Sequence, residues 1–240
     1  MFHFKQFSVN HSQSTMKVGS DAVLLGAWMP LPENCKTVLE IGSGCGVISL
    51  MLAQRTSANI TGIDIDEKSV MEAQKNAENS PWNEQVQFIQ ENVQDFAQHS
   101  TQKFEVIVTN PPFFENSLKS PETSKNISKH NDRLTFEELI TAVDILLSEN
   151  GRFGVILPPE QAEKLEKLMF ISHLFATKKT TIYPTSQKNA NRMLMMFERE
   201  YAVCEEDKLT LRDNGYTNEY YQLVNRYLIT NPSVETVGKN

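Results

Sequence analysis

The sequence lacks the features that would place a chain in a membrane, in an oxidising compartment or around a metal ion. It has no apolar run near the ~18 residues that a transmembrane helix needs. Its 3 cysteines, Cys35, Cys45 and Cys204, are odd in number and have no disulfide or zinc spacing. The 5 histidines are scattered without a metal-binding pattern. We therefore expect a reducing compartment and no metal site.

The sequence also has little that would mark it as exported or as a general nucleic-acid binder. Its first residues lack the basic and then apolar pattern of a secretory signal, and no internal repeat or low-complexity tract is present. The formal net charge is -7, so any contact with nucleic acid would have to be local. A chain of 240 residues, 40% hydrophobic, is long enough for one sizeable core. These properties predict a cytoplasmic enzyme without a membrane or an obligate protein partner.

The most informative segment is a strand-like run, residues 104–109, that ends in Asn110-Pro111-Pro112-Phe113. Ligands of open α/β sheets bind at the carboxyl ends of the strands. There the Asn110 amide oxygen and the Pro111 carbonyl are two acceptors for an NH₂ group on a flat ring, and Phe113 can stack on that ring. The prolines hold the backbone extended in advance. The segment is typical of methyl transfer to an amino group, although a plain proline turn is the alternative.

A second segment has the character of a ligand-binding loop between a strand and a helix. A short apolar strand, 37–42, leads into three alternating glycines, Gly42, Gly44 and Gly46, and then into a helix. The spacing differs from the dinucleotide pattern, and Glu40 would repel a phosphate. Its carboxylate suits a cation instead, and S-adenosylmethionine carries an ammonium and a sulfonium group.

The next strand supplies a candidate for a ribose contact. Residues 59–64 end in Asp64, about 20 residues after the glycine loop, which is the spacing of a ribose-binding carboxylate. A helix cap is the alternative role for Asp64, but Asp66 is better placed to cap the following helix.

Apolar periodicity predicts strands that alternate with helices along the chain. The expected strands are 37–42, 59–64, 86–90, 104–109, 152–157, 176–183, 192–200 and 209–211, and the expected helices are 21–28, 46–55, 67–79, 135–147, 159–171 and 218–228. This order predicts an α/β fold with a mainly parallel, twisted sheet, helices on both faces and an antiparallel edge strand.

Two stretches carry local positive charge. Lysines, an arginine and a histidine gather in 116–133, next to the proposed reaction site, and Lys178 and Lys179 form a smaller basic spot. Each is either a phosphate contact or a solvated loop. The polar segment 185–191 between two expected strands is predicted to be a mobile loop.

Taken together, these motifs resemble class I S-adenosylmethionine-dependent methyltransferases, and more narrowly the bacterial tRNA1(Val) adenosine N6-methyltransferase family. The resemblance covers nearly the whole chain and includes the glycine loop and the Asn110 segment. It is most specific in the following segments: Phe4-Lys5-Gln6-Phe7, Met16-Lys17-Val18-Gly19-Ser20-Asp21, Leu24-Leu25-Gly26-Ala27-Trp28 and Asn79-Ser80-Pro81-Trp82. It implies a Rossmann-like core over 36–200, an N-terminal covering segment over 1–35 and a C-terminal strand and helix over 201–240, together forming one methyltransferase domain.

The resemblance also implies roles for individual residues. The three glycines would line the methionine and ribose parts of S-adenosylmethionine, whose product is S-adenosylhomocysteine. Asp64 would accept from the ribose hydroxyls. Ser20 and Asp21 would close over the methionine end, unless Ser20 simply caps a helix. Asn92 stands where the family has an Asp that receives the adenine amino group, and Asp95 is the alternative.

The implied reaction is N6-methylation of an adenosine in tRNA, at position 37 of tRNA1(Val). Other acceptors stay open: guanine in ribosomal RNA, adenine in DNA or a protein glutamine. Glutamine enzymes usually have a helical domain before the glycine loop, whereas only about 35 residues precede this one. A binding module without catalysis is a further alternative.

Overall fold

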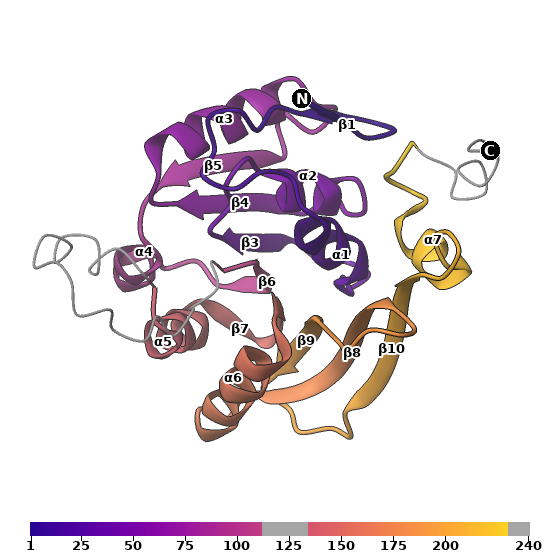
Figure 1. Cartoon of the computed structure of the whole chain (residues 1–240). Coiled ribbons are helices and arrows are strands. Elements are labelled where there is room, and N and C mark those ends of the chain that lie inside the picture. Colours follow the sequence, from indigo (N-terminus) through magenta and orange to yellow (C-terminus); the bar gives the residue numbers. More distant parts are fainter. Residues whose placement is uncertain (112–133, 230–240) are drawn as a thin grey trace, which may run out of the picture.

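The computed structural model describes residues 1–111 and 134–229, and its centre is one eight-stranded sheet (Figure 1). The order of strands across the sheet is β10-β8-β9-β7-β6-β3-β4-β5. Their bounds are β3 (Thr37–Ile41), β4 (Asn59–Asp64), β5 (Val86–Gln90), β6 (Phe104–Thr109), β7 (Leu147–Leu157), β8 (Phe175–Thr185), β9 (Arg192–Glu198) and β10 (Glu205–Arg212). Pro112, Phe113 and the basic stretch 116–133 therefore lie outside the described residues.

The sheet is mainly parallel, as the sequence predicts, but its antiparallel strand is not at an edge. β9 runs antiparallel to both β7 and β8, while β10 pairs in parallel with β8. β9 therefore lies inside the sheet, and the predicted edge position is wrong. The difference arises because β10, Glu205–Arg212, is longer than the three-residue strand expected and extends the sheet by one strand.

Helices cover both faces of the sheet and bury two separate cores. The helices are α1 (Ser20–Trp28), α2 (Val47–Ala53), α3 (Glu67–Glu78), α4 (Val93–His99), α5 (Phe136–Leu146), α6 (Pro159–Ile171) and α7 (Asn218–Val224). Residues of α1, α2 and α7 form one core, and residues of α4, α5 and α6 form the other. Neighbouring strand residues divide between them: Val38 faces the first and Leu39 the second, as the two-residue period of a strand requires.

Capping residues fix the first turns of two helices, α3 and α5. Asp66 caps α3 by accepting from the Ser69 backbone, which confirms that expectation. Thr135 and Glu138 form a complete capping box at α5. Ser20 is different: Gly19 is the N-cap residue of α1 and makes no side-chain cap, so a capping role for Ser20 is wrong.

The first residues of the chain are tied to its end and to α3. β1 (Phe2–His3) and β2 (Ser8–Val9) form a small antiparallel hairpin, and Phe4 bridges to Leu228. The side chain of Asn76 in α3 then bonds both backbone groups of Asn10 at 2.8 Å. Figure 1 shows this front segment lying beside α3, at the top of the view.

Glu72 holds the next part of the front segment. Its carboxylate, 5% exposed, accepts from the backbone nitrogens of Ser12, Gln13 and Ser14 and from both serine hydroxyls, at 2.6–3.1 Å. Burial raises the pKa of Glu72, but the hydrogen bonds from Ser14, Gln13 and Ser12 outweigh it and lower that pKa to about 2. Residues 10–14 are therefore fixed against α3 by two buried polar side chains.

Among residues 1–111 and 134–229, no helix is both long and apolar enough to cross a membrane. The same ranges contain no group of three or more His, Cys, Asp or Glu side chains arranged to hold a metal ion.

Candidate active site

The carboxyl ends of four adjacent parallel strands bring most of the predicted site residues to one edge of the sheet. β3 leads into the glycine loop, β4 ends at Asp64, β5 is followed by Asn92, and β6 is followed by Asn110. In the sheet β6 is next to β3, and β3 is next to β4. The topology thus places the Asn110 segment beside the glycine loop, although 60 to 70 residues separate them in the sequence.

The glycine loop has a backbone conformation that residues other than glycine rarely adopt. Gly42, Gly44 and Gly46 have φ angles of 71°, 52° and 78°, all in the left-handed region. A Cβ atom built on Gly42 or Gly44 would meet nothing within 4 Å. These two positions therefore require glycine for their conformation, and they border open space in which a ligand can approach the backbone.

Gly46 is glycine for a second reason, which is packing. It is the N-cap residue of α2, and a Cβ there would lie 2.5 Å from the Phe88 ring. The same ring of β5 would also clash with a Cβ on Gly62, at 2.4 Å. Phe88 thus occupies the inner side of the loop, so only Gly42 and Gly44 face the open space.

Asp64 is held in position by the backbone and keeps acceptor capacity. One oxygen accepts from Gly44 N at 2.7 Å and the other from Asp66 N at 2.9 Å. A carboxylate has about four acceptor positions, so two remain for hydroxyl groups. Burial raises the pKa of Asp64, with the bonds from Asp66 and Gly44 opposing this. The carboxylate therefore gains from any further donor or nearby cation.

Glu40 lies deeper than Asp64 and is bound to α2. It is 1% exposed, and its Oε2 accepts from the Ser49 backbone at 2.9 Å and from the Ser49 hydroxyl. Burial raises the pKa of Glu40 to about 8, against the lowering effect of Ser49, and the charge of Asp64 raises it further. Because it is buried, Glu40 presents no open surface to a ligand, and it could act on one only through the charge of its ionised form.

Asn110 has an acceptor that no described group uses. Its Oδ1 atom is buried, and among the residues that the structure describes nothing donates to it. The preceding strand is fixed by Thr109, whose hydroxyl donates to Ile41 O on β3 at 2.8 Å. Buried polar atoms are nearly always satisfied, so an unpaired oxygen at a sheet edge points to a missing donor. Pro111 is buried directly after it.

Ser20 and Asp21 lie at the start of α1 and are linked to the far part of the sheet. Asp21 accepts from Arg192 Nε on β9 at 2.7 Å, and Ser20 Oγ donates weakly to Asp21 at 3.4 Å. Sequence reasoning missed Arg192. No local signal could have found it, because 171 residues separate it from Asp21.

Asn92 caps α4 and is bonded to its proposed alternative. Its Oδ1 accepts from Asp95 N at 2.7 Å, and its Nδ2 donates to Asp95 Oδ2 at 2.6 Å. Both side chains therefore lie together, near the end of β5. The amide orients the carboxylate, and the Asp95 Oδ1 atom is the less constrained acceptor of the pair.

Comparison with known proteins gives the same fold. A predicted O-methyltransferase from Agrobacterium tumefaciens superposes with a TM-score of 0.68 at 18% identity, covering 86% of this chain and 96% of the other. A glycopeptide N-methyltransferase solved with S-adenosylmethionine superposes with a TM-score of 0.55 at 10% identity, covering 75% and 95% of the two chains. Together with the site edge, these likenesses define the class: the fold is that of a class I S-adenosylmethionine-dependent methyltransferase.

Sequence relatives narrow the class. The family model for the methyltransferase small domain matches residues 4–169. The tRNA1(Val) (adenine(37)-N6)-methyltransferase of Flavobacterium psychrophilum is 40% identical over 232 residues, covering 95% of this chain and 99% of the relative. Its counterpart in Bacteroides fragilis is 36% identical over 234 residues, covering 95% and 97%. The chain belongs to the methyltransferase small domain family and, within it, to the tRNA1(Val) (adenine(37)-N6)-methyltransferases.

Proposed function

We propose that this enzyme transfers a methyl group from S-adenosylmethionine to N6 of an adenosine in tRNA, at position 37 of tRNA1(Val). The observation that carries the proposal is the buried Asn110 Oδ1, to which no described residue donates, on the strand next to the glycine loop. A hydrogen-bond acceptor that lacks a donor suits a substrate amino group, and the open space beside the backbone of Gly42 and Gly44 suits a cofactor. The names of the relatives supply the tRNA and the position.

The described residues fit the cofactor in shape and in charge. Gly42 and Gly44 leave room for it against the backbone. Asp64 would accept from its ribose hydroxyls, and the half-buried carboxylate of Asp64, together with that of buried Glu40 once it is ionised, would favour its positive charge. Asn92 with Asp95 would receive its adenine amino group, and Ser20 and Asp21 would close over its methionine end. When bound, S-adenosylmethionine supplies a methyl group that is activated by a neighbouring sulfonium.

The protein's own contribution to the reaction is positioning. Asn110 Oδ1 and the Pro111 carbonyl would each accept a hydrogen bond from the target amino group. Two acceptors draw the nitrogen lone pair out of conjugation with the ring and aim it at the methyl group. Preorganised polar groups of this kind supply much of the rate in many enzymes. Phe113, which lies outside the described residues together with Pro112, would stack on the base. An adenosine in a single-stranded loop can be turned out into such a pocket.

We further propose that the chain acts as one methyltransferase domain, with 36–200 as its core. The front segment over 1–35 would cover the cofactor side, supported by the contacts of residues 10–14 with α3. The extension over 201–240 would add β10 and α7 to the far side of the sheet.

The decisive experiment replaces the unpaired acceptor. Asn110→Ala should lower turnover on tRNA by about 10²-fold or more, as expected for loss of one preorganised group. Cofactor affinity should stay within a few-fold, because Asn110 would contact the target amino group and not the cofactor. Turnover is measured with labelled cofactor and affinity by titration calorimetry.

The control is Thr37→Ala, a change at the opposite end of the adjacent strand β3. Near wild-type turnover in Asn110→Ala would remove the proposed role. If nucleoside analysis found N2-methylguanosine instead of N6-methyladenosine, the reaction class would stand and the substrate would be different.

A further inference from the structure

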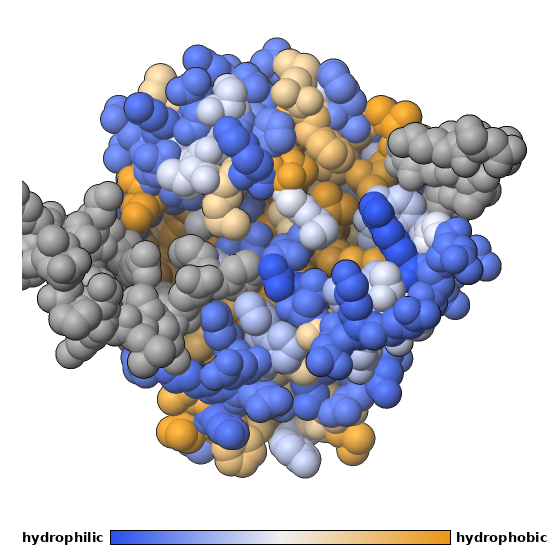
Figure 2. All heavy atoms as spheres, in the orientation of Figure 1, coloured by the Kyte–Doolittle hydropathy of each residue, from blue (hydrophilic) through white to orange (hydrophobic). Residues whose placement is uncertain are grey.

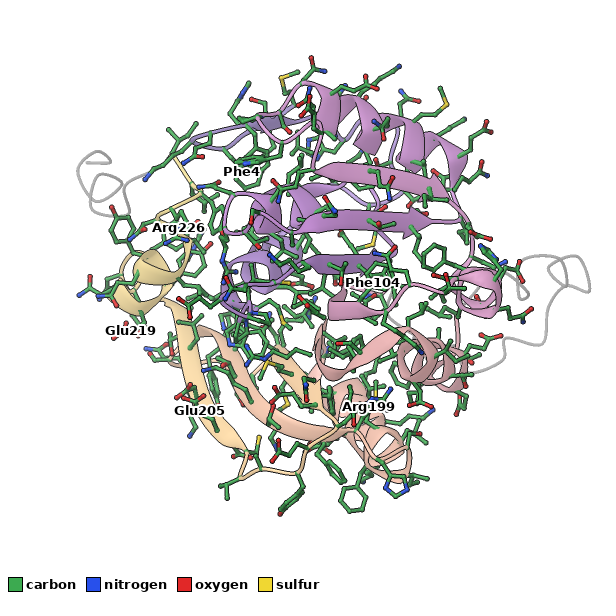
Figure 3. All side chains as sticks on the ribbon, turned by 180° about the vertical axis from the view of Figure 1, so that it is seen from behind. Phe4, Phe104, Arg199, Glu205, Glu219 and Arg226 are labelled. Carbon is green, nitrogen blue, oxygen red and sulfur yellow. The ribbon has the colours of Figure 1, made fainter. Side chains whose placement is uncertain are left out.

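The far end of the sheet separates positive from negative charge along its strands. At the amino ends of β8 and β10 and the end of β9, five acids gather: Glu198, Glu200, Glu205, Glu206 and Asp207. Figure 3, seen from behind, labels Arg199 and Glu205 in the lower part of the molecule, with Glu219 on α7 above Glu205. At the opposite ends of the same strands, residues 183–192 contain Lys188 and Arg192 and no acid.

The bases on the acidic side are neutralised. Lys178 pairs with Glu205 at 2.8 Å, Lys179 with Glu206 at 2.9 Å, and Arg199 with Asp144 at 2.7 Å. Lys178 and Lys179 were candidate phosphate contacts from the sequence. Their carboxylate partners make them poor ones, because a phosphate would have to displace a carboxylate already in place.

The basic side chains at the opposite ends of these strands include two that are exposed and outside any ion pair of the described residues, Lys188 and Arg212. Arg192 is paired with Asp21. The first acids after Arg212 in the sequence are Asp213 and Glu219. Asp213 accepts from the backbone and hydroxyl of Ser186, and Glu219 lies in the first turn of α7.

Arg212 is also held in a fixed position. Its guanidinium lies 4.3 Å from the centre of the Tyr216 ring and donates to the Tyr216 hydroxyl. Tyr216 in turn stacks on Tyr220, with ring centres 4.9 Å apart. Tyr220 is buried, Tyr216 is half-buried and Arg212 is exposed, so the stack runs from the core to the solvent. A guanidinium ordered in this way loses little entropy when it binds a phosphate.

The loop that carries Lys188 is tied to the same turn. Asp213 holds Ser186, and Asn191 N donates to Ile182 O at 3.0 Å. The predicted loop 185–191 is therefore anchored by hydrogen bonds at both ends. Figure 2 shows a mostly hydrophilic surface around α7 and the end of β10, at the right of the view.

The strands that carry this surface run in the same direction as the strand that leads to Asn110. β8 and β10 run parallel to β6, so Thr185 and Arg212 end their strands in the same sense as Thr109. β10 is four strands from β6 in the sheet order. At about 4.8 Å a strand, the axes are roughly 19 Å apart. A partner that bridges the two must be larger than one nucleotide.

We propose that Lys188 and Arg212 form a docking surface for the phosphate backbone of the folded RNA, away from its target nucleotide. The inference rests on the proposed function, since it assumes that the Asn110 edge receives an RNA base. Arg212 would bind a phosphate through two parallel N–H donors, and Lys188 would contact a neighbouring one. The acids on the other side of the strands would repel the RNA and fix its direction of approach.

The test compares two variants with the same change of charge. Lys188→Gln/Arg212→Gln should weaken tRNA binding roughly tenfold or more, the effect of losing two charge-assisted contacts. It should also reduce the slope of log affinity against log salt by about 1–2. Lys178→Gln/Arg199→Gln, on the acidic side, should bind as wild type does. Binding is followed by fluorescence anisotropy of labelled tRNA at several salt concentrations.

Kinetics give an independent readout. The docking variant should raise KM for tRNA with little change in kcat, and its cofactor affinity should not change. Equal tRNA affinity in the two double variants would overturn the docking surface while leaving the proposed function intact. Wild-type enzyme that methylates no RNA would instead overturn the proposed function. Lys188→Gln alone, in an exposed loop, serves if the double variant does not fold.

Discussion

At the scale of single residues, Asp64 is held by two backbone N–H groups and is proposed to bind the ribose of the cofactor. Asp64→Ala should weaken S-adenosylmethionine binding by roughly 1.5–3 kcal/mol, the value of hydrogen bonds to a charged group. Asp66→Ala is the matched control, because Asp66 caps α3 two residues away. It should lower the melting temperature but leave most of the affinity. Titration calorimetry measures the affinity of both variants. An Asp64→Ala variant that binds like wild type would exclude the ribose contact.

Glu40 predicts a pH dependence of cofactor binding. Its pKa is raised to about 8 by burial, so it is mostly protonated at neutral pH. A bound cation favours the charged form, so binding should release a proton, and affinity should rise with pH between about 6 and 8. Calorimetry in buffers of different ionisation heat detects that proton. Glu40→Gln should bind with no such pH dependence; a wild-type profile equally flat would contradict the role of Glu40.

The same shift has the opposite effect on the protein without cofactor. The folded pKa of Glu40 lies above the ordinary value of 4.5. Between these two values the unfolded chain loses its proton first, so the free energy of unfolding falls as pH rises.

Asn92 and Asp95 form a pair whose members can be tested separately. Asn92→Asp should retain cofactor binding, since a carboxylate accepts as well as an amide and still caps α4. If Asn92 receives the adenine amino group, Asn92→Ala should weaken binding more than Asp95→Ala does. The reverse order, measured by the same titration, would assign the contact to Asp95, whose Oδ2 is held by Asn92 at 2.6 Å.

At the scale of elements, the contact between α3 and the front segment depends on one carboxylate. Glu72→Ala should lower the free energy of unfolding by roughly 2–4 kcal/mol, because it leaves the buried donors of Ser14 and the part-buried donors of Ser12 and Gln13 without a partner. The matched control is Glu78→Ala, an exposed acid on the same helix. Urea denaturation measures both variants.

The pH dependence of this contact has the opposite sign to that of Glu40. The folded pKa of Glu72 is lowered to about 2, below its ordinary value of 4.5. Its contribution is therefore complete above about 4.5 and is lost as pH falls towards 2. The difference in stability between wild type and Glu72→Gln should shrink over that interval. A constant difference would contradict the hydrogen-bond assignment.

Element prediction from the sequence succeeded where the apolar pattern was strong. β3, β4 and β6 are buried and strongly apolar, and their bounds agree with expectation to within a residue. α4 was not predicted, because Val93–His99 is short and mostly polar. The first half of β10 was missed because Glu-Glu-Asp-Lys does not look like a strand. Charged residues are nevertheless common on edge strands, where they prevent pairing with other chains.

At the scale of the whole molecule, the site residues that stand in short sequence motifs could be predicted, whereas those brought together from distant parts of the chain could not. The glycines and Asn110 stand in short motifs, so the sequence indicates them without a structure. The Asp21–Arg192 pair and the Glu72 contacts join residues 171 and 58–60 positions apart. The antiparallel direction of β9 places Arg192, its first residue, next to Asp21 at the start of α1, and it depends on the order of strands in the sheet. Such features follow from topology and could not be derived from any one segment.

The joining of the chain's beginning to its end has a consequence for how the protein is made. Lys5 N donates to Tyr227 O at 2.8 Å, and Trp28 donates to Thr180 at 2.8 Å, across 222 and 152 residues. These two contacts can therefore form only after Tyr227 and Thr180 have been synthesised. Phe7 can pack against Trp82 much earlier in synthesis, whereas Phe4 lacks its bridge to Leu228 until then. Maturation should accordingly be slow and late, since contacts this distant must wait for the rest of the chain to fold.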